Sequence, residues 1–247
     1  NASDAMDKLR YLTLSDSKYK SMEFSPRVDI EFEEKNKVKT LTIIDNGIGM
    51  NKEDLVEHLG TIARSGTKKF MEKLSGDSKK DSNLIGQFGV GFYSSFMVAD
   101  SVEVTTKKAG EKKAFLWKSN GQTGFSISEV EKDSCGTVIK LFLNDEGSEY
   151  TNKWSIETTV KKYSDHIAFP IYLHYTEKKD KKEEDIIDQV NSASAFWKRS
   201  KSSLKKKDYN EFYKTFANEN EDPMFHIHTT AEGTLDYTTL FYVPKVA

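Results

Sequence analysis

The stretch Ile43-Ile44-Asp45-Asn46-Gly47-Ile48-Gly49-Met50 decides the fold and the site of this chain. It reads as a buried strand that ends in a carboxylate and continues into two glycines one residue apart. A carboxylate at such a turn can accept a hydrogen bond from a flat ligand's amino edge, and glycines let the backbone approach that ligand closely. Adenine offers an amino donor where guanine has an acceptor, although guanine can present other donors. A turn without a ligand gives the same pattern.

The bulk composition sets limits on what the chain can be. Its 247 residues suffice for one large domain, or for a medium domain plus part of another. Hydrophobic residues are 36% and aromatic residues 12%, which argues against wholesale disorder. The net charge of -2 gives no support for nucleic acid or a membrane as the main partner. Cys135 is the sole cysteine, which excludes an intrachain disulfide and suits a reducing compartment.

Periodicity predicts the elements of an α+β fold. Apolar spacing predicts a helix over 1–14, and alternation predicts strands over 28–32 and 39–45. Asn51 followed by Asp54 predicts a capped helix to about residue 59. Further predicted elements are strands at 102–105, 115–117, 125–127 and 137–143 and a helix over 155–168. We therefore expect a two-layer sandwich of helices on a mixed, mostly antiparallel sheet, followed by the start of a second α/β domain.

Charge and aromatic patterns divide the chain. We expect a first domain over 1–175, a charged linker over 176–186 and the beginning of a second domain over 187–247. In the second part, Asp208 and Glu211 have the spacing of a capping box before a helix with one aromatic face, from Tyr209 to Phe216. A strand is predicted over 235–243.

Three further segments fit a pocket around Asp45. The residues Asn1, Asp4, Ala5 and Lys8 share one helix face, where an asparagine oxygen suits Mg²⁺, although such a stripe is ordinarily solvated. The segment from about 60 to 91 is rich in glycine, serine and lysine and predicts a mobile lid. Within it, 86–91 reads G-x-x-G-x-G and enters a predicted helix over 93–99, an arrangement that binds phosphate. The chain contains no Walker motif.

In this order, the segments resemble the ATP-binding fold shared by gyrase, heat-shock protein 90, histidine kinases and MutL. Within that group the chain most closely resembles the heat-shock protein 90 chaperone family in its bacterial form. The resemblance is carried by 1–5, 45–50, 59–67 and 85–94. The bacterial marks are His58, 162–167, 195–197 and the short charged linker.

The resemblance implies ATP or ADP with Mg²⁺ as ligands and gives roles to single residues. Asp45 would bind the adenine amino group, with Thr137 beside it through water, and Gly49 and Met50 would lie against the base. Asn1 would help to hold Mg²⁺. Arg64 stands where many relatives have lysine. The complete predicted binding set is Asn1, Asp4, Ala5, Lys8, Asp45, Gly49, Met50, His58, Gly60, Arg64, Gly89, Val90, Gly91, Phe92 and Thr137, the stretch from Gly89 to Phe92 wrapping the phosphates.

The resemblance also implies what the whole protein does. It would be a cytoplasmic, homodimeric ATPase that acts as a chaperone on client proteins, with no nucleic-acid or membrane partner. No catalytic residue is expected in this chain: the family's water-activating glutamate would precede Asn1, and its phosphate-sensing arginine would follow Ala247. We therefore expect weak nucleotide binding and almost no hydrolysis. The alternatives are a DNA-acting ATPase of gyrase or mismatch-repair type and a nucleotide-sensing module without turnover.

Several reactive residue types are expected to have structural or surface roles. His226 and His228 lie two apart without further clustered ligands, so we do not predict a metal site there. Cys135 is expected to be inert. The remaining histidines, at 58, 166 and 174, are interpreted as helix and surface residues. The basic run over 198–207 is interpreted as a solvated face.

Overall fold

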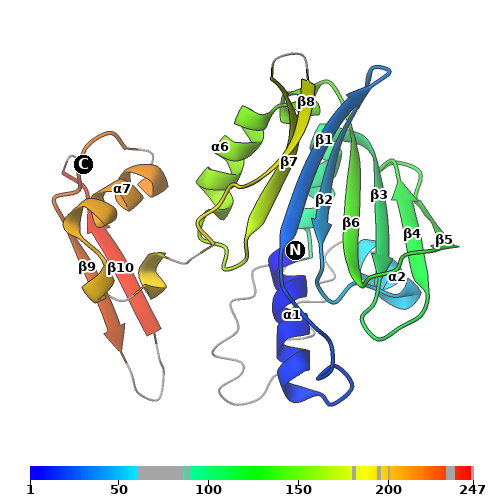
Figure 1. Cartoon of the computed structure of the whole chain (residues 1–247), viewed down its shortest axis with the longest axis horizontal. Coiled ribbons are helices and arrows are strands. Elements are labelled where there is room, and N and C mark those ends of the chain that lie inside the picture. Colours follow the sequence, from blue (N-terminus) through cyan, green and yellow to red (C-terminus); the bar gives the residue numbers. More distant parts are fainter. Residues whose placement is uncertain are drawn as a thin grey trace.

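The computed structural model contains one eight-stranded sheet with helices packed on it, followed by a smaller unit with a two-stranded sheet (Figure 1). It describes residues 1–60, 86, 89–179, 182–193, 196–199, 201–217, 219–231 and 237–245. The large sheet has the order β5-β4-β3-β6-β2-β1-β7-β8. Its strands are β1 (Val28–Lys35), β2 (Val38–Asp45), β3 (Ala99–Lys107), β4 (Ala114–Ser119), β5 (Phe125–Val130), β6 (Gly136–Leu143), β7 (Ile171–Lys179) and β8 (Lys182–Gln189). Strands β1 and β7 run parallel and the other neighbours antiparallel, so the predicted mixed sheet is confirmed.

The helices cover one face of this sheet. They are α1 (Ala2–Ser15), α2 (Lys52–Leu59), the short α5 (Ser95–Val98) and α6 (Lys153–Ser164), with 3₁₀ turns η1 (Gly91–Ser94) and η2 (Glu146–Thr151). The strand register aligns apolar side chains across the sheet on that face, as in the row Ile30, Ile43, Ile139 and Val104. Met6 of α1 and Ile156 of α6 pack against one half of the face, and Leu55 of α2 packs against the other half. The predicted two-layer α+β sandwich is therefore confirmed.

Local capping sets the helix boundaries. The Asn51 side chain accepts from the Asp54 N–H at 3.0 Å and the Asp54 carboxylate accepts from the Asn51 N–H at 3.1 Å, so the predicted capping box is confirmed. Helix α6 begins two residues earlier than predicted, because the Asn152 side chain caps it by accepting from the Ser155 N–H at 3.0 Å. None of the helices within the described ranges combines the length and apolar composition that spanning a membrane requires.

The charged run over 176–186 is not an unstructured connection. Most of it belongs to the antiparallel hairpin of β7 and β8, which extends the sheet at one edge (Figure 1). Thr176 pairs with Asp185 and Glu177 with Glu184. Our linker prediction was wrong at this level because backbone pairing needs no apolar pattern, and charged residues are favoured on exposed edge strands. The position of the domain boundary remains a prediction.

The chain leaves this hairpin through Asn191, a buried residue. Its side-chain oxygen accepts from the Ile171 N–H at 2.8 Å, and its amide donates to the Phe169 carbonyl at 2.9 Å and the Ile167 carbonyl at 3.3 Å. The neighbouring Ser192 hydroxyl donates to Asp165 at 2.8 Å. Asn191 thus ties the exit of β8 to the loop between α6 and β7.

The smaller unit consists of 3₁₀ turns η3 (Phe196–Lys198) and η4 (Lys201–Ser203), helix α7 (Lys206–Ala217) and the antiparallel strands β9 (Phe225–Ala231) and β10 (Tyr237–Val243). Its aromatic helix face is confirmed at Tyr209 and Tyr213, which are buried, but Phe216 is 75% exposed. The predicted cap is wrong: Asp208 lies within the first turn, and its carboxylate accepts from the Lys205 N–H at 2.7 Å.

Candidate functional site

A row of three buried polar residues crosses the sheet where β2 ends. Strand register places Asp45 of β2 opposite Thr137 of β6, and Thr137 opposite Thr106 of β3. Their exposed fractions are 7%, 5% and 0%, respectively. We call Asp45, Thr137 and Thr106 the polar row. It lies on the helix-covered face, in line with the apolar residues of the same strands, because side chains two residues apart share a face.

The electrostatics of Asp45 reflect its position in this row. Burial raises the pKa of Asp45 to about 6, although hydrogen bonds from the Gly47 and Thr137 backbones act in the opposite direction. The Gly47 N–H donates to Asp45 Oδ1 at 2.9 Å. With this pKa the side chain is mostly ionised at pH 7. Asp45 is therefore a buried hydrogen-bond acceptor at neutral pH.

Thr106 holds the row together and was missed from the sequence. Its hydroxyl accepts from the Met50 N–H at 2.9 Å, donates to the Gly136 carbonyl at 3.1 Å and lies 3.1 Å from the Thr137 hydroxyl. The available signal was a threonine in phase with Val102 and Val104, two buried residues of the same strand. A hydroxyl that continues an apolar face is costly to bury without partners, which points to a specific role.

The glycines after Asp45 make room for the protein's own backbone. A Cβ on Gly47 would lie 2.6 Å from the Ala5 carbonyl carbon. Gly49 has φ +65°, and a Cβ there would lie 2.0 Å from the Lys107 carbonyl oxygen. The Ile48 N–H donates to the Ala5 carbonyl at 3.0 Å. The expectation that these glycines clear space for a ligand is thus corrected: α1 and the end of β3 occupy that space.

The predicted stripe on α1 is divided by the fold. Ala5 contacts the Asp45 turn through its backbone, and Asp4 is buried, accepting from the Gly86 N–H at 2.7 Å. Burial lowers the pKa of Lys8, while the charges of Asp4 and Asp54 partly counteract this. Asn1 is exposed and caps α1 without a side-chain hydrogen bond. Asp4 and Lys8 therefore line the interior side of α1, whereas the role of Asn1 stays a prediction.

The residues predicted around the lid are only partly within the described ranges. Gly60 ends α2, where a Cβ would lie 2.5 Å from the Val56 carbonyl oxygen and 2.8 Å from the Phe125 ring. His58 is in the last turn of α2, 4.0 Å from Glu57. Arg64 and most of the predicted lid lie outside the described residues.

The glycine-rich turn before η1 borders open space. Gly89 has φ +67°, which favours glycine, and Val90 is half exposed. A Cβ on Gly91 would meet no atom within 4 Å. The Phe92 ring, by contrast, packs edge-on against Trp117 at 5.5 Å between centroids, inside the apolar core. Phe92 can thus present only its backbone to a ligand, while its ring anchors the turn.

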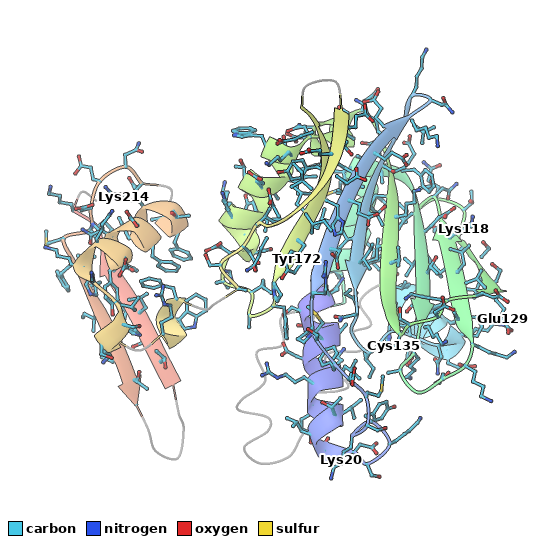
Figure 2. All side chains as sticks on the ribbon, in the orientation of Figure 1. Lys20, Lys118, Glu129, Cys135, Tyr172 and Lys214 are labelled. Carbon is cyan, nitrogen blue, oxygen red and sulfur yellow. The ribbon has the colours of Figure 1, made fainter. Side chains whose placement is uncertain are left out.

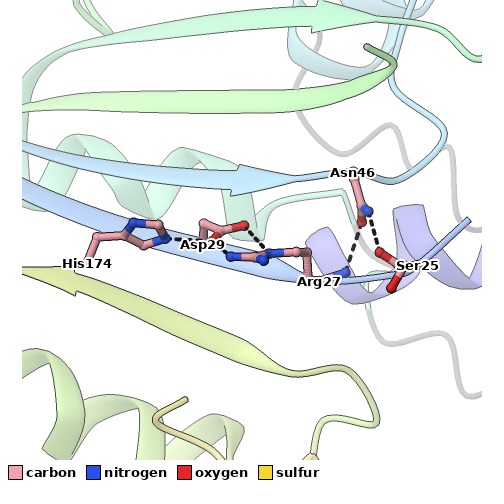
Figure 3. A network of polar contacts seen from close by, with 5 residues as sticks. All are labelled: Ser25, Arg27, Asp29, Asn46 and His174. Carbon is pink, nitrogen blue, oxygen red and sulfur yellow. Dashed lines mark hydrogen bonds and ion pairs between the residues drawn. The ribbon is translucent and has the colours of Figure 1, made fainter. Parts of the chain in front are cut away.

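Asn46, beside Asp45, faces a different network (Figure 3). Its side chain accepts from the Arg27 N–H at 2.9 Å and donates to the Ser25 carbonyl at 2.6 Å. The Arg27 guanidinium donates to Asp29, and His174 Nε2 lies 2.6 Å from the same carboxylate. The surface interpretation of His174 was wrong: it lies in β7 and is half-buried, because Asp29 of β1 provides its partner.

Other reactive groups do not join the polar row. His226 and His228 both contact Tyr209, through ring stacking and a 2.7 Å hydrogen bond respectively. Across the described ranges, no three histidine, cysteine, aspartate or glutamate side chains gather as a metal site. Burial raises the pKa of the Cys135 thiol, labelled in Figure 2, which agrees with the expected inertness. A cavity of about 480 Å³ lies beside Asn51 and Glu111, and none of the predicted binding residues lines it.

The donor and acceptor types of the row fit an amino group. A carboxylate accepts only, and an exocyclic amine offers two N–H donors. The open space at Gly91 fits close approach of another group to the backbone.

Comparison with known proteins agrees with this geometry. Residues 15–137 match the family model described as histidine kinase-, DNA gyrase B-, and HSP90-like ATPase. Sheet, helix layer and polar row therefore define a protein of this ATPase class. Residues 175–247 match the model described as Hsp90 protein, and the chain belongs to the Hsp90 family. The second match favours this family over the DNA-acting members of the class.

The similar relatives share one printed name, chaperone protein HtpG. That of Wolinella succinogenes is 56% identical over 247 residues, covering 100% of this chain and 40% of the relative. Those of Helicobacter pylori and Treponema denticola are 55% and 51% identical, covering 100% of this chain and 41% of each relative. The chain thus spans about two fifths of the length of these curated relatives.

Proposed function

We propose that this chain is the adenine-nucleotide-binding part of an ATP-driven molecular chaperone. The observation that carries the proposal is the buried polar row, in which an ionised Asp45 and the Thr137 hydroxyl lie side by side on one strand rung. Buried polar groups of this kind need partners, and a purine amino group supplies two donors. The names of the relatives support the chaperone function.

In this proposal each part of the site has one task. Asp45 accepts from the adenine amino group and Thr137 assists through water. Gly49 and Met50 border the base, and the backbone from Gly89 to Phe92 approaches the phosphates. Asn1 takes part in holding Mg²⁺, whose chemistry is to neutralise phosphate charge when bound. Asp4, Ala5, Lys8, His58, Gly60 and Arg64 complete the surroundings.

The proposal also covers turnover and assembly. We expect weak binding and little hydrolysis from these 247 residues, because the family's glutamate and arginine have no counterpart among them. In the whole protein, nucleotide binding would close the lid and drive cycling of a cytoplasmic homodimer on client proteins. Robust ATP turnover by the purified chain would contradict the expected division of labour.

Comparing adenosine with ADP tests the base site and the phosphate site separately. We expect Asp45→Asn to weaken both ligands, by roughly 10- to 100-fold, because a hydrogen bond to a charged acceptor is lost. Gly91→Ala should weaken ADP alone, because its Cβ enters open space without touching the fold. Asp29→Asn is the control, since Asp29 belongs to the Arg27–His174 network. Calorimetry or ligand-observed NMR at millimolar ligand provides the affinities. Unchanged ADP affinity in Asp45→Asn would remove Asp45 from the adenine role.

A further inference from the structure

Thr106 has a fully buried hydroxyl whose three contacts determine its orientation. The Met50 N–H, the Gly136 carbonyl and the Thr137 hydroxyl lie 2.9, 3.1 and 3.1 Å from Thr106 Oγ1. A hydroxyl has one proton to donate and two lone pairs to accept with. The three contacts together use this capacity completely.

Only one assignment makes all three contacts hydrogen bonds. The Met50 N–H can only donate, so it takes one lone pair of Thr106. The Gly136 carbonyl can only accept, so it takes the Thr106 proton. The remaining lone pair of Thr106 can only accept, so the proton between the two hydroxyls belongs to Thr137. Thr137 thus points its proton away from Asp45's end of the row and keeps only lone pairs for a ligand.

This arrangement gives the site one polarity. Asp45, ionised at neutral pH, and Thr137, with its proton committed to Thr106, are both acceptors. A 6-aminopurine presents an amino group there, whereas a 6-oxopurine presents an acceptor oxygen. A bridging water does not reverse the preference, because a water that donates to Thr137 keeps lone pairs for an amino group.

We propose that Thr106 is a specificity-determining positioning residue, which selects 6-aminopurine over 6-oxopurine nucleotides by fixing Thr137 as an acceptor. The inference rests on the proposed adenine-nucleotide function and adds a residue that touches no ligand. Removing the Thr106 hydroxyl frees the Thr137 proton, which then turns toward the ligand and accommodates an oxygen at the 6-position. Specificity should relax even where overall affinity changes little.

The test compares ADP with inosine diphosphate, which differs at the 6-position, on the 247-residue chain. The readout is the ratio of the two dissociation constants by calorimetry or ligand-observed NMR. In Thr106→Val we expect the preference for ADP to fall by about tenfold, the size of one hydrogen bond. Thr106→Ser keeps the hydroxyl and should restore the wild-type preference.

A double-mutant cycle separates positioning from fold stability. Thr137→Val should also lower the preference, and adding Thr106→Val to it should produce no further change, because Thr106 acts through Thr137. If Thr106→Val does not fold, Thr137→Val still decides: an unchanged preference overturns the inference. Equal weakening of both nucleotides by Thr106→Val also overturns it, since that is a purely structural effect. Failure of the wild-type chain to bind ADP at all overturns the proposed function itself.

Discussion

Replacing Asp45 by asparagine should stabilise the fold while it weakens the ligand. Burial raises the pKa of Asp45 from its ordinary 3.8 to about 6. Between these values the folded chain binds more protons than the unfolded chain, so stability falls as pH rises through this window. At about 1.4 kcal/mol per pH unit, the ionised carboxylate costs the fold at most about 3 kcal/mol above pH 6. Asparagine removes the charge yet keeps an oxygen for the Gly47 N–H.

The assay is urea unfolding of the wild-type chain and the variant at pH 7.5 and pH 4. We expect Asp45→Asn to raise the free energy of unfolding at pH 7.5, by up to about 3 kcal/mol, and to have little effect at pH 4. ADP affinity should change in the opposite direction at pH 7.5. Gain of stability with loss of affinity is expected where a binding site holds an unfavourable charge.

Asp29→Asn is the matched control, because the same substitution removes a carboxylate of opposite character. Burial alone would raise the pKa of Asp29, but hydrogen bonds from Arg27 and His174 outweigh this and lower it. Its charge therefore stabilises the fold at neutral pH, and the variant should be less stable. If Asp45→Asn is destabilised at pH 7.5 as Asp29→Asn is, the account of Asp45 as a strained buried charge is refuted.

Three other predictions follow from single contacts. Asn191→Ala should cost roughly 2–4 kcal/mol of unfolding free energy, because it leaves the buried Ile171 N–H and nearby carbonyls unpaired, whereas Ser192→Ala should remain near wild type by urea unfolding. Gly49→Ala should yield little folded protein by circular dichroism, since its Cβ collides with the Lys107 carbonyl at 2.0 Å; Gly124→Ala, with positive φ but open surroundings, should cost only about 1–2 kcal/mol. ADP affinity should be about tenfold weaker at pH 5 than at pH 7.5, because Asp45 is then protonated, and a flat calorimetric profile would contradict the assigned role.

Local signals in the sequence were reliable where neighbouring residues alone decide the structure. The Asn51–Asp54 capping box forms as predicted because both partners lie in one helical turn. Strand alternation placed β1, β2 and β6 correctly, since one buried face imposes a period of two. Local patterns failed at Asp208, which has the spacing of a cap but lies inside the helix.

The sequence by itself determined the ATP-binding class of the chain, its helix and strand pattern, and Asp45 as the residue at the centre of the site. The tertiary structure decided what surrounds that residue. Thr106 and Thr137 are 31 positions apart and meet only through strand register. Gly49 is required by the Lys107 carbonyl, which lies 58 positions further along the chain. The charged run became a hairpin because an edge strand can pair through its backbone alone. Each of these depends on contacts between distant segments, which no local pattern encodes.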